Sequence, residues 1–201
     1  MKRTVKQNRH QGRINQIMQQ SEEIIRMLNA DGDMHKGILK IVDTCAHTLK
    51  KGGKVLFCGN GGSAADAQHL ASELAGRFYF DRPPLNAEAL HVNTSYLTAV
   101  ANDYTYDEVF SRLVKAKGRK GDVLIAISTS GNSKNVLNAL KVAREMGIIT
   151  VGLTGRTGGM MKDLCTHILH VPSDDTPRVQ EGHIMLGHII CELVESKMFP
   201  G

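Results

Sequence analysis

The sequence contains no tryptophan, and aromatic residues make up only 4% of its 201 residues. Nucleic-acid-binding surfaces usually interleave basic residues with aromatic ones, so this scarcity argues against such a surface. No apolar run approaches the ~18 residues of a membrane span, and no apolar segment follows the basic start as it would in a signal peptide. We therefore expect a protein that binds neither nucleic acid nor membrane and works in the cytoplasm.

The cysteines are few and widely spaced. Cys45, Cys58, Cys165 and Cys191 form no C-x-x-C pair of the kind that binds zinc or does redox chemistry. They are typical of reduced, mostly buried thiols in a cytosolic protein.

The composition, 41% apolar and 22% charged, excludes a disordered chain and fits one globular core. The net charge of +5 comes from the start of the chain, where five basic residues precede the first acid, Glu22. We expect a basic tail over residues 1–13, either solvated and frayed or acting as an electrostatic arm, and a single domain over residues 14–201.

Apolar residues recur at helical spacing over residues 14–28, 36–50 and 178–198. Between them, apolar β-branched runs at 54–58, 87–92, 122–127, 148–153 and 167–171 alternate with helical stretches. Runs that are apolar throughout indicate parallel strands covered on both faces. The pattern predicts an α/β fold: a three-layer α/β/α sandwich with a five-stranded parallel sheet, an N-terminal helical pair and a long C-terminal helix.

The terminal helices offer more apolar surface than one such sheet needs. We therefore expect them to mediate oligomerisation; the alternative is simple packing on the sheet. A monomeric mass in solution would exclude the first interpretation.

Two loops at the carboxyl ends of predicted strands have similar chemistry. Residues 59–63 read Gly-Asn-Gly-Gly-Ser and residues 128–133 read Ser-Thr-Ser-Gly-Asn-Ser, and each precedes a helical pattern. Glycine backbone N–H groups, serine hydroxyls and a helix N-terminus together suit a phosphate group. Neither loop has the Gly-Lys-Ser/Thr ending that binds a nucleoside triphosphate with magnesium.

These loops have two other interpretations. Gly59, Gly61 and Ala64 match the G-x-G-x-x-A dinucleotide pattern, but no acid follows the second strand to hold a ribose. Either loop alone could also be ordinary turn and helix-cap chemistry. Their occurrence on two successive strand–helix units favours phosphate.

Polar side chains recur on two of the predicted helices, and on the first of them two share one face. His69 and Glu73 are four residues apart, and Gln180 and His188 are eight apart on the C-terminal helix. Such side chains can bind zinc or transfer protons. Alternatively, His69 and Glu73 form an exposed surface pair and His188 is a core histidine.

The longest distinctive strings are 58–74, Ala101-Asn-Asp103, 128–133 and 176–188. On these strings the chain resembles the sugar isomerase (SIS) domain family and, within it, the phosphoheptose isomerases, over nearly its whole length. The resemblance implies a five-stranded parallel sheet and a homotetramer with sites at subunit interfaces. It implies conversion of sedoheptulose 7-phosphate to D-glycero-D-manno-heptose 7-phosphate, the first step of nucleotide-activated heptose synthesis for lipopolysaccharide or other surface glycans.

The resemblance also implies roles for individual residues. The phosphate would lie on Ser63, Ser128, Thr129, Ser130 and Ser133, and the sugar would contact Asn60, Gly61, Asp103, Glu73 and Gln180. Glu73 would be the base and His188 the acid. His69, Glu73, Gln180 and His188 would bind one Zn²⁺ per subunit, so the catalytic and metal roles overlap.

The chain departs from the family at one position, and two other functions share parts of its pattern. Ser72 stands where some family members carry a second acid. A non-catalytic SIS protein, which binds a phosphosugar or associates with a replication initiator, would keep the loops and lose the acid–base pair; Glu73 and His188 favour the enzyme. An isomerase for another sugar phosphate, such as arabinose 5-phosphate, is disfavoured by the same pair and by the lack of an appended regulatory domain.

Overall fold

The structure is a computed structural model that describes residues 2–200, with side chains from His10 onward. It confirms the predicted α/β sandwich. The elements in chain order are α1 (Lys2–Ala30), α2 (Gly32–Lys50), β1 (Val55–Gly59), α3 (Gly62–Ala75), β2 (Ala87–Ala89), α4 (Thr94–Asp103), η1 (Tyr106–Glu108), α5 (Val109–Lys117), β3 (Val123–Ser128), α6 (Lys134–Glu145), β4 (Ile149–Thr154), η2 (Gly159–Asp163), β5 (His167–His170) and α7 (Thr176–Met198).

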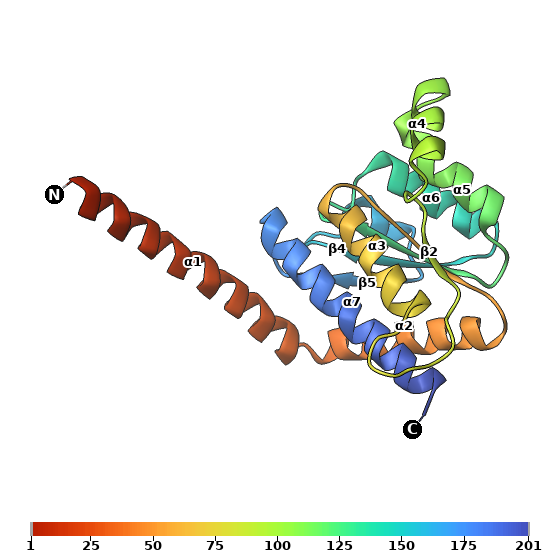
Figure 1. Cartoon of the computed structure of the whole chain (residues 1–201), viewed down its shortest axis with the longest axis horizontal. Helices are drawn as coiled ribbons and strands as arrows, with labels where there is room; N and C mark the ends of the chain where they lie inside the picture. Colours follow the sequence, from red (N-terminus) through yellow and green to blue (C-terminus); the bar gives the residue numbers. More distant parts are fainter. Residues whose placement is uncertain (1, 201) are drawn as a thin grey trace.

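All five strands are parallel and lie in the order β2-β1-β3-β4-β5. Side chains alternate across each strand, so β1 sends Val55 and Phe57 to one face and Leu56 and Cys58 to the other. The first face packs on α2, α3, α7 and the end of α1, and the second on α4, α5 and α6 (Figure 1). Covering both faces explains why the strand sequences are apolar throughout.

Helix α1 is longer than the sequence pattern indicates. It begins at Lys2 and continues through the segment that we expected to be a tail. Figure 1 shows its N-terminal part projecting away from the sheet, and its side chains are exposed from His10 to Gln16. Only the end of the helix reaches the core, through Ile24 and Leu28. The basic segment is therefore helical in this structure.

Strand β2 is shorter than the expected 87–92. It lies at the edge of the sheet and pairs with β1 over only three residues. After one further ladder bond, from Leu90 N to Phe57 O (2.9 Å), the chain turns so that the Asn93 side chain can cap α4 by accepting from Tyr96 N (3.0 Å). The other four strands lie within one residue of their expected bounds at each end.

The strand order fixes where a ligand would bind. From β1 the chain moves outward to β2 and then returns to place β3 on the other side of β1. Such a switch in winding direction leaves a crevice at the carboxyl ends of the two strands. The two glycine- and serine-rich loops follow β1 and β3, so both border this crevice. None of the described helices is long and apolar enough to cross a bilayer.

Candidate active site

The first loop is shaped by its glycines. A Cβ at Gly59 would lie 2.5 Å from the carbonyl oxygen of Ser63, so the turn closes only with glycine there. Gly61 precedes α3 with a φ of +55°, a conformation that favours glycine. The turn points the start of α3, with buried Ser63, toward the crevice between β1 and β3. This is the arrangement expected of an anion-binding loop.

The Asn60 side chain is fixed by its neighbours. Its amide exchanges two hydrogen bonds of 2.9 Å with the amide of buried Asn135, the second residue of α6. The hydroxyl of Tyr106 also donates to Asn60 Oδ1 (3.1 Å). Neither partner of Asn60 could be predicted from a local sequence pattern, because the three residues come from three separate segments.

The second loop is supported by the segment that follows β4. Gly131 has a φ of +65°, and a Cβ there would collide with the carbonyl of Gly158. The N–H of Met161 donates to Gly131 O (3.1 Å), and the N–H of Gly155 to Thr129 O (3.0 Å). The hydroxyl oxygens of Ser128 and Ser133 are 3.0 Å apart, whereas Ser130 is exposed. The loop therefore presents hydroxyl groups from a fixed backbone.

Three of the predicted residues form one cluster between α3 and α7. His69 Nε2 lies 3.2 Å from Glu73 Oε1 and 2.9 Å from His188 Nε2. One ligand atom from each residue lies within 4.8 Å of those of the other two. The ring of Phe78 stands edge-on to His188, with centroids 6.0 Å apart. A carboxylate and two imidazoles so close together can share a proton or bind a metal ion.

Asp66 also faces this cluster, although we gave it no role from the sequence. It lies one turn before His69 on α3, and its Oδ2 is buried without a hydrogen-bond partner. Burial raises the pKa of Asp66, while His69 and His188 act in the opposite direction. In the sequence, the only feature that indicates a role for Asp66 is its spacing of three residues from His69.

Two predicted residues lie away from the cluster in this structure. Asp103 is the exposed last residue of α4, and its carboxylate accepts a bond from Asn102 Nδ2 (2.9 Å). The amide of Gln180 lies against Gly62, with Nε2 2.5 Å from where a Cβ would stand. Gln180 is thus beside the first loop, about two helical turns before His188.

Comparison with known proteins is consistent with this geometry. Residues 18–155 match the SIS domain family. The chain is 50% identical to the phosphoheptose isomerase of Burkholderia pseudomallei over 96% of this chain and 98% of that protein. The phosphoheptose isomerase GmhA of Neisseria gonorrhoeae superposes with a TM-score of 0.82 at 41% identity, covering 94% of this chain and 98% of that one. The phosphoheptose isomerase of Francisella tularensis superposes with a TM-score of 0.87 at 34% sequence identity, covering 93% of this chain and 98% of that one. This chain belongs to the phosphoheptose isomerase family of SIS-domain proteins.

Proposed function

We propose that this protein is a phosphoheptose isomerase that converts sedoheptulose 7-phosphate to D-glycero-D-manno-heptose 7-phosphate. The observation that carries the proposal is the cluster of Glu73, His69 and His188 beside two phosphate-type loops, in a chain half identical to enzymes of that name. A non-catalytic SIS protein has no need of an acid–base pair whose ligand atoms lie within 4.8 Å of each other, and nothing in the comparisons favours that alternative.

The phosphate group binds at the two loops. Ser63, Ser128, Thr129, Ser130 and Ser133 supply hydroxyl groups, and the backbone N–H groups at the starts of α3 and α6 supply partial positive charge. Asn60, Gly61, Asp103 and Gln180 contact the sugar chain. The fixed Asn60 amide, held by Asn135, suits this positioning role because its geometry is set before substrate arrives.

The isomerisation moves one proton between C1 and C2. Glu73 removes a proton from C1 of the ketose while His188 protonates the carbonyl oxygen at C2, which gives a cis-enediol. The proton then returns to C2, and loss of the O1 hydroxyl proton to His188 produces the aldehyde. Glu73 is partly buried at 20% side-chain exposure, which limits competition from water for the base.

The cluster also fits a zinc ion. The donor set of two imidazoles and a carboxylate is one that zinc prefers, and the ligand atoms are already within reach of a common point. We propose one Zn²⁺ per subunit on His69, Glu73 and His188. Gln180, which lies beside the first loop in this structure, is the fourth ligand that the family resemblance implies. Zinc at this place would polarise the substrate carbonyl as a Lewis acid.

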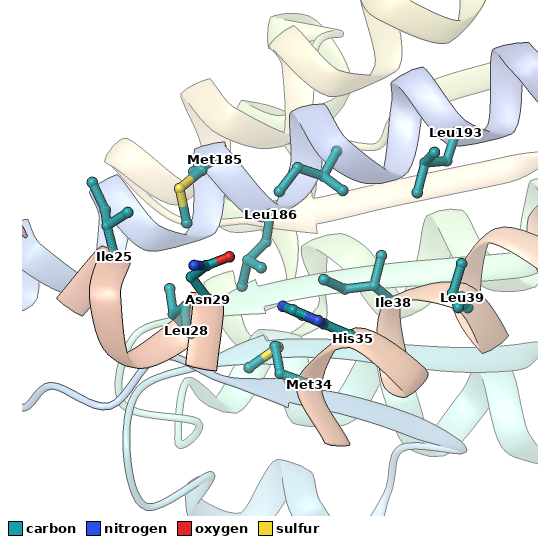
Figure 2. Close-up of a pocket in the computed structure, with 11 residues that line it drawn as sticks. Ile25, Leu28, Asn29, Met34, His35, Ile38, Leu39, Met185, Leu186 and Leu193 are labelled. Carbon is teal, nitrogen blue, oxygen red and sulfur yellow. The ribbon is translucent and has the colours of Figure 1, made fainter. Parts of the chain in front are cut away.

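We further propose that the protein is a homotetramer with its active sites at subunit interfaces. An apolar groove of about 370 Å³ lies between the end of α1, α2 and α7 (Figure 2). Ile25 and Leu39 on its rim are 52% and 55% exposed. Figure 2 shows side chains from all three helices pointing into this groove, so terminal helices of another subunit could bury it.

The cellular setting follows from the same chemistry. All four cysteines are unpaired, and burial raises the pKa of Cys45 to about 12. Such thiols suit the reducing cytoplasm. The product would feed nucleotide-activated heptose synthesis for lipopolysaccharide or another surface glycan.

The direct test is NMR of the protein with sedoheptulose 7-phosphate in D₂O, after chelation and again with added zinc. We expect aldose signals and deuterium at C2. Comparison of the isomerisation rate after chelation with the rate after zinc is added back shows whether the reaction needs the metal. Binding of the sugar phosphate without turnover in either condition would instead identify a binding protein.

A further inference from the structure

A buried ion pair lies just behind the candidate active site. The side chains of Arg82, in the loop after α3, and Glu195, on α7, are only 2% and 1% exposed, and Arg82 Nε donates to Glu195 Oε1 (2.8 Å). Neither residue was singled out by any pattern in the sequence. Burying two charges is costly unless the remaining polar atoms are also satisfied, so their other partners are informative.

The remaining donors of Arg82 bind the end of α3. Nη2 donates to the carbonyl oxygen of Glu73 itself (2.9 Å), and Nη1 donates to those of Leu74 (2.8 Å) and Gly76 (2.9 Å). These carbonyl groups belong to the last turn of the helix and its cap, where no intrahelical partner is available. The Arg82 guanidinium therefore fixes, by hydrogen bonds, the backbone of the turn that carries Glu73.

Glu195 holds the loop from the other side. Its carboxylate accepts three successive backbone N–H groups, from Phe78 (2.9 Å), Tyr79 (2.6 Å) and Phe80 (3.1 Å). Burial alone would raise the pKa of Glu195, but these N–H groups and Arg82 lower it below its usual value. The carboxylate is therefore ionised at neutral pH and fully hydrogen-bonded.

This network connects the two helices that carry the cluster. Glu195 follows His188 by seven residues, which places the two side chains on nearly the same face of α7, two turns apart. The loop held by Glu195 carries Phe78, whose ring stands against His188. One end of the network thus binds the Glu73 backbone, and the other binds the backbone N–H of Phe78, whose ring packs on His188.

We propose that Arg82 and Glu195 are positioning residues that set the distance between Glu73 on α3 and His188 on α7. This rests on the proposed function, in which these two groups exchange protons with one substrate. Arg82 and Glu195 bind backbone groups around the site rather than the side chains of the cluster. Their effect is geometric, and an error of about 1 Å in such a placement can lower a rate by up to ~100-fold.

A second buried pair in the same protein provides a matched control. Asp122, at the amino-terminal edge of the sheet, accepts from Lys54 Nζ (2.6 Å), from Lys54 N (3.0 Å) and from Arg119 N (2.8 Å). It is 3% exposed, and its partner Lys54 is 18% exposed. Asp122→Asn and Glu195→Gln therefore both remove the charge of a buried carboxylate that binds backbone N–H groups, but only Glu195 connects α3 with α7.

The experiment compares kcat and KM for sedoheptulose 7-phosphate in the full-length wild type, Glu195→Gln, Arg82→Lys and Asp122→Asn, at a temperature where each is shown to be folded. We expect Glu195→Gln and Arg82→Lys to lower kcat by about 10-fold or more, with KM within about twofold, because the phosphate loops are unchanged. Asp122→Asn should keep kcat within about twofold of wild type despite lower stability. Arg82→Lys retains the charge, so it carries the test if Glu195→Gln does not fold.

A second readout does not depend on turnover. The measurement is the NMR chemical shift of His188 in protein labelled at histidine Cε1, with the signal assigned by its loss in His188→Gln. This signal should shift in Glu195→Gln and Arg82→Lys because the Phe78 ring moves. It should stay in place in Asp122→Asn. Equal losses of kcat in Glu195→Gln and Asp122→Asn would overturn the proposal. A wild-type kcat together with an unmoved His188 signal in both Glu195→Gln and Arg82→Lys would also overturn it. An inactive wild type would contradict the proposed function, whereas the His188 signal would still test the geometry.

Discussion

His69 and His188, which are 119 positions apart in the chain, place their Nε2 atoms 2.9 Å from each other. One of the two nitrogens must accept in such a contact, so at most one ring carries a proton on both nitrogens. Two imidazoles beside a carboxylate form a site that can take up either a proton or a metal ion. This contact gives a structural reason why the catalytic and metal-binding roles that we propose overlap on the same residues.

Replacing the carboxylate of Glu73 tests the assignment of the base. Glu73→Gln should lower kcat by at least ~100-fold, because the amide cannot accept the proton from carbon. Ser72→Ala is the matched control on the same turn, since the Ser72 hydroxyl donates only to the carbonyl of His69 (2.7 Å). Activity of Glu73→Gln within a few fold of wild type would remove Glu73 from the mechanism.

The zinc assignment can be tested without turnover. Titration against a chromogenic chelator should show one zinc per subunit, and His69→Ala should weaken its binding by more than ~10-fold, since even outer partners of metal ligands are worth that much. His47→Ala, which removes an exposed histidine of α2, should leave zinc binding unchanged. Unaltered affinity in His69→Ala would contradict the site.

The second loop should act on substrate binding. Ser130→Ala removes an exposed hydroxyl that we assign to the phosphate, and hydrogen bonds to charged groups are worth about 1.5–3 kcal/mol. We therefore expect KM for sedoheptulose 7-phosphate and the inhibition constant of inorganic phosphate to rise together by ~10-fold or more. Ser95→Ala, on the exposed side of α4, should change neither value.

Buried His183 should make stability depend on pH. Burial lowers the pKa of His183 from 6.5 to about 4, against the opposing effect of the Thr154 backbone. Between these values the unfolded chain binds a proton that the folded chain does not, so stability is lost as the pH falls from 6.5 toward 4. The loss should amount to roughly 3 kcal/mol over that range.

Urea unfolding at pH 7, 6 and 5, at one protein concentration, measures this dependence. His183→Gln should show a flatter dependence than wild type, even though its stability at pH 7 is lower. His47→Gln controls for removal of an imidazole as such. An equally steep dependence in His183→Gln would assign the effect to other groups.

The apolar groove should be an interface between subunits. Leu39→Glu places a charge on its rim and should reduce the molar mass measured by light scattering at micromolar concentration, from that of a tetramer to a smaller species. Met160→Glu alters a side chain of the same 55% exposure outside the groove and should not change the mass. A monomeric wild type would exclude the interface.

The sequence predicts most of the fold because the strands are apolar throughout and the loops follow them directly. Part of the cluster could also be predicted from the sequence, since His69 and Glu73 share a helix face. The contact of this face with His188 depends on how α3 packs on α7, which no local pattern encodes. Arg82 and Glu195, separated by 113 positions, show the same limit, because a buried charge looks like a surface charge until its partner is in place.

The strand order also has a consequence for folding. Strands β1 and β3 are neighbours at the centre of the sheet, yet α3, β2, α4 and α5 lie between them in the chain. Pairings between distant segments form slowly, because the intervening chain must be ordered or confined first. The loops after β1 and β3 face each other only once that pairing exists. Substrate binding would therefore report completion of the central sheet, since neither loop forms the site by itself.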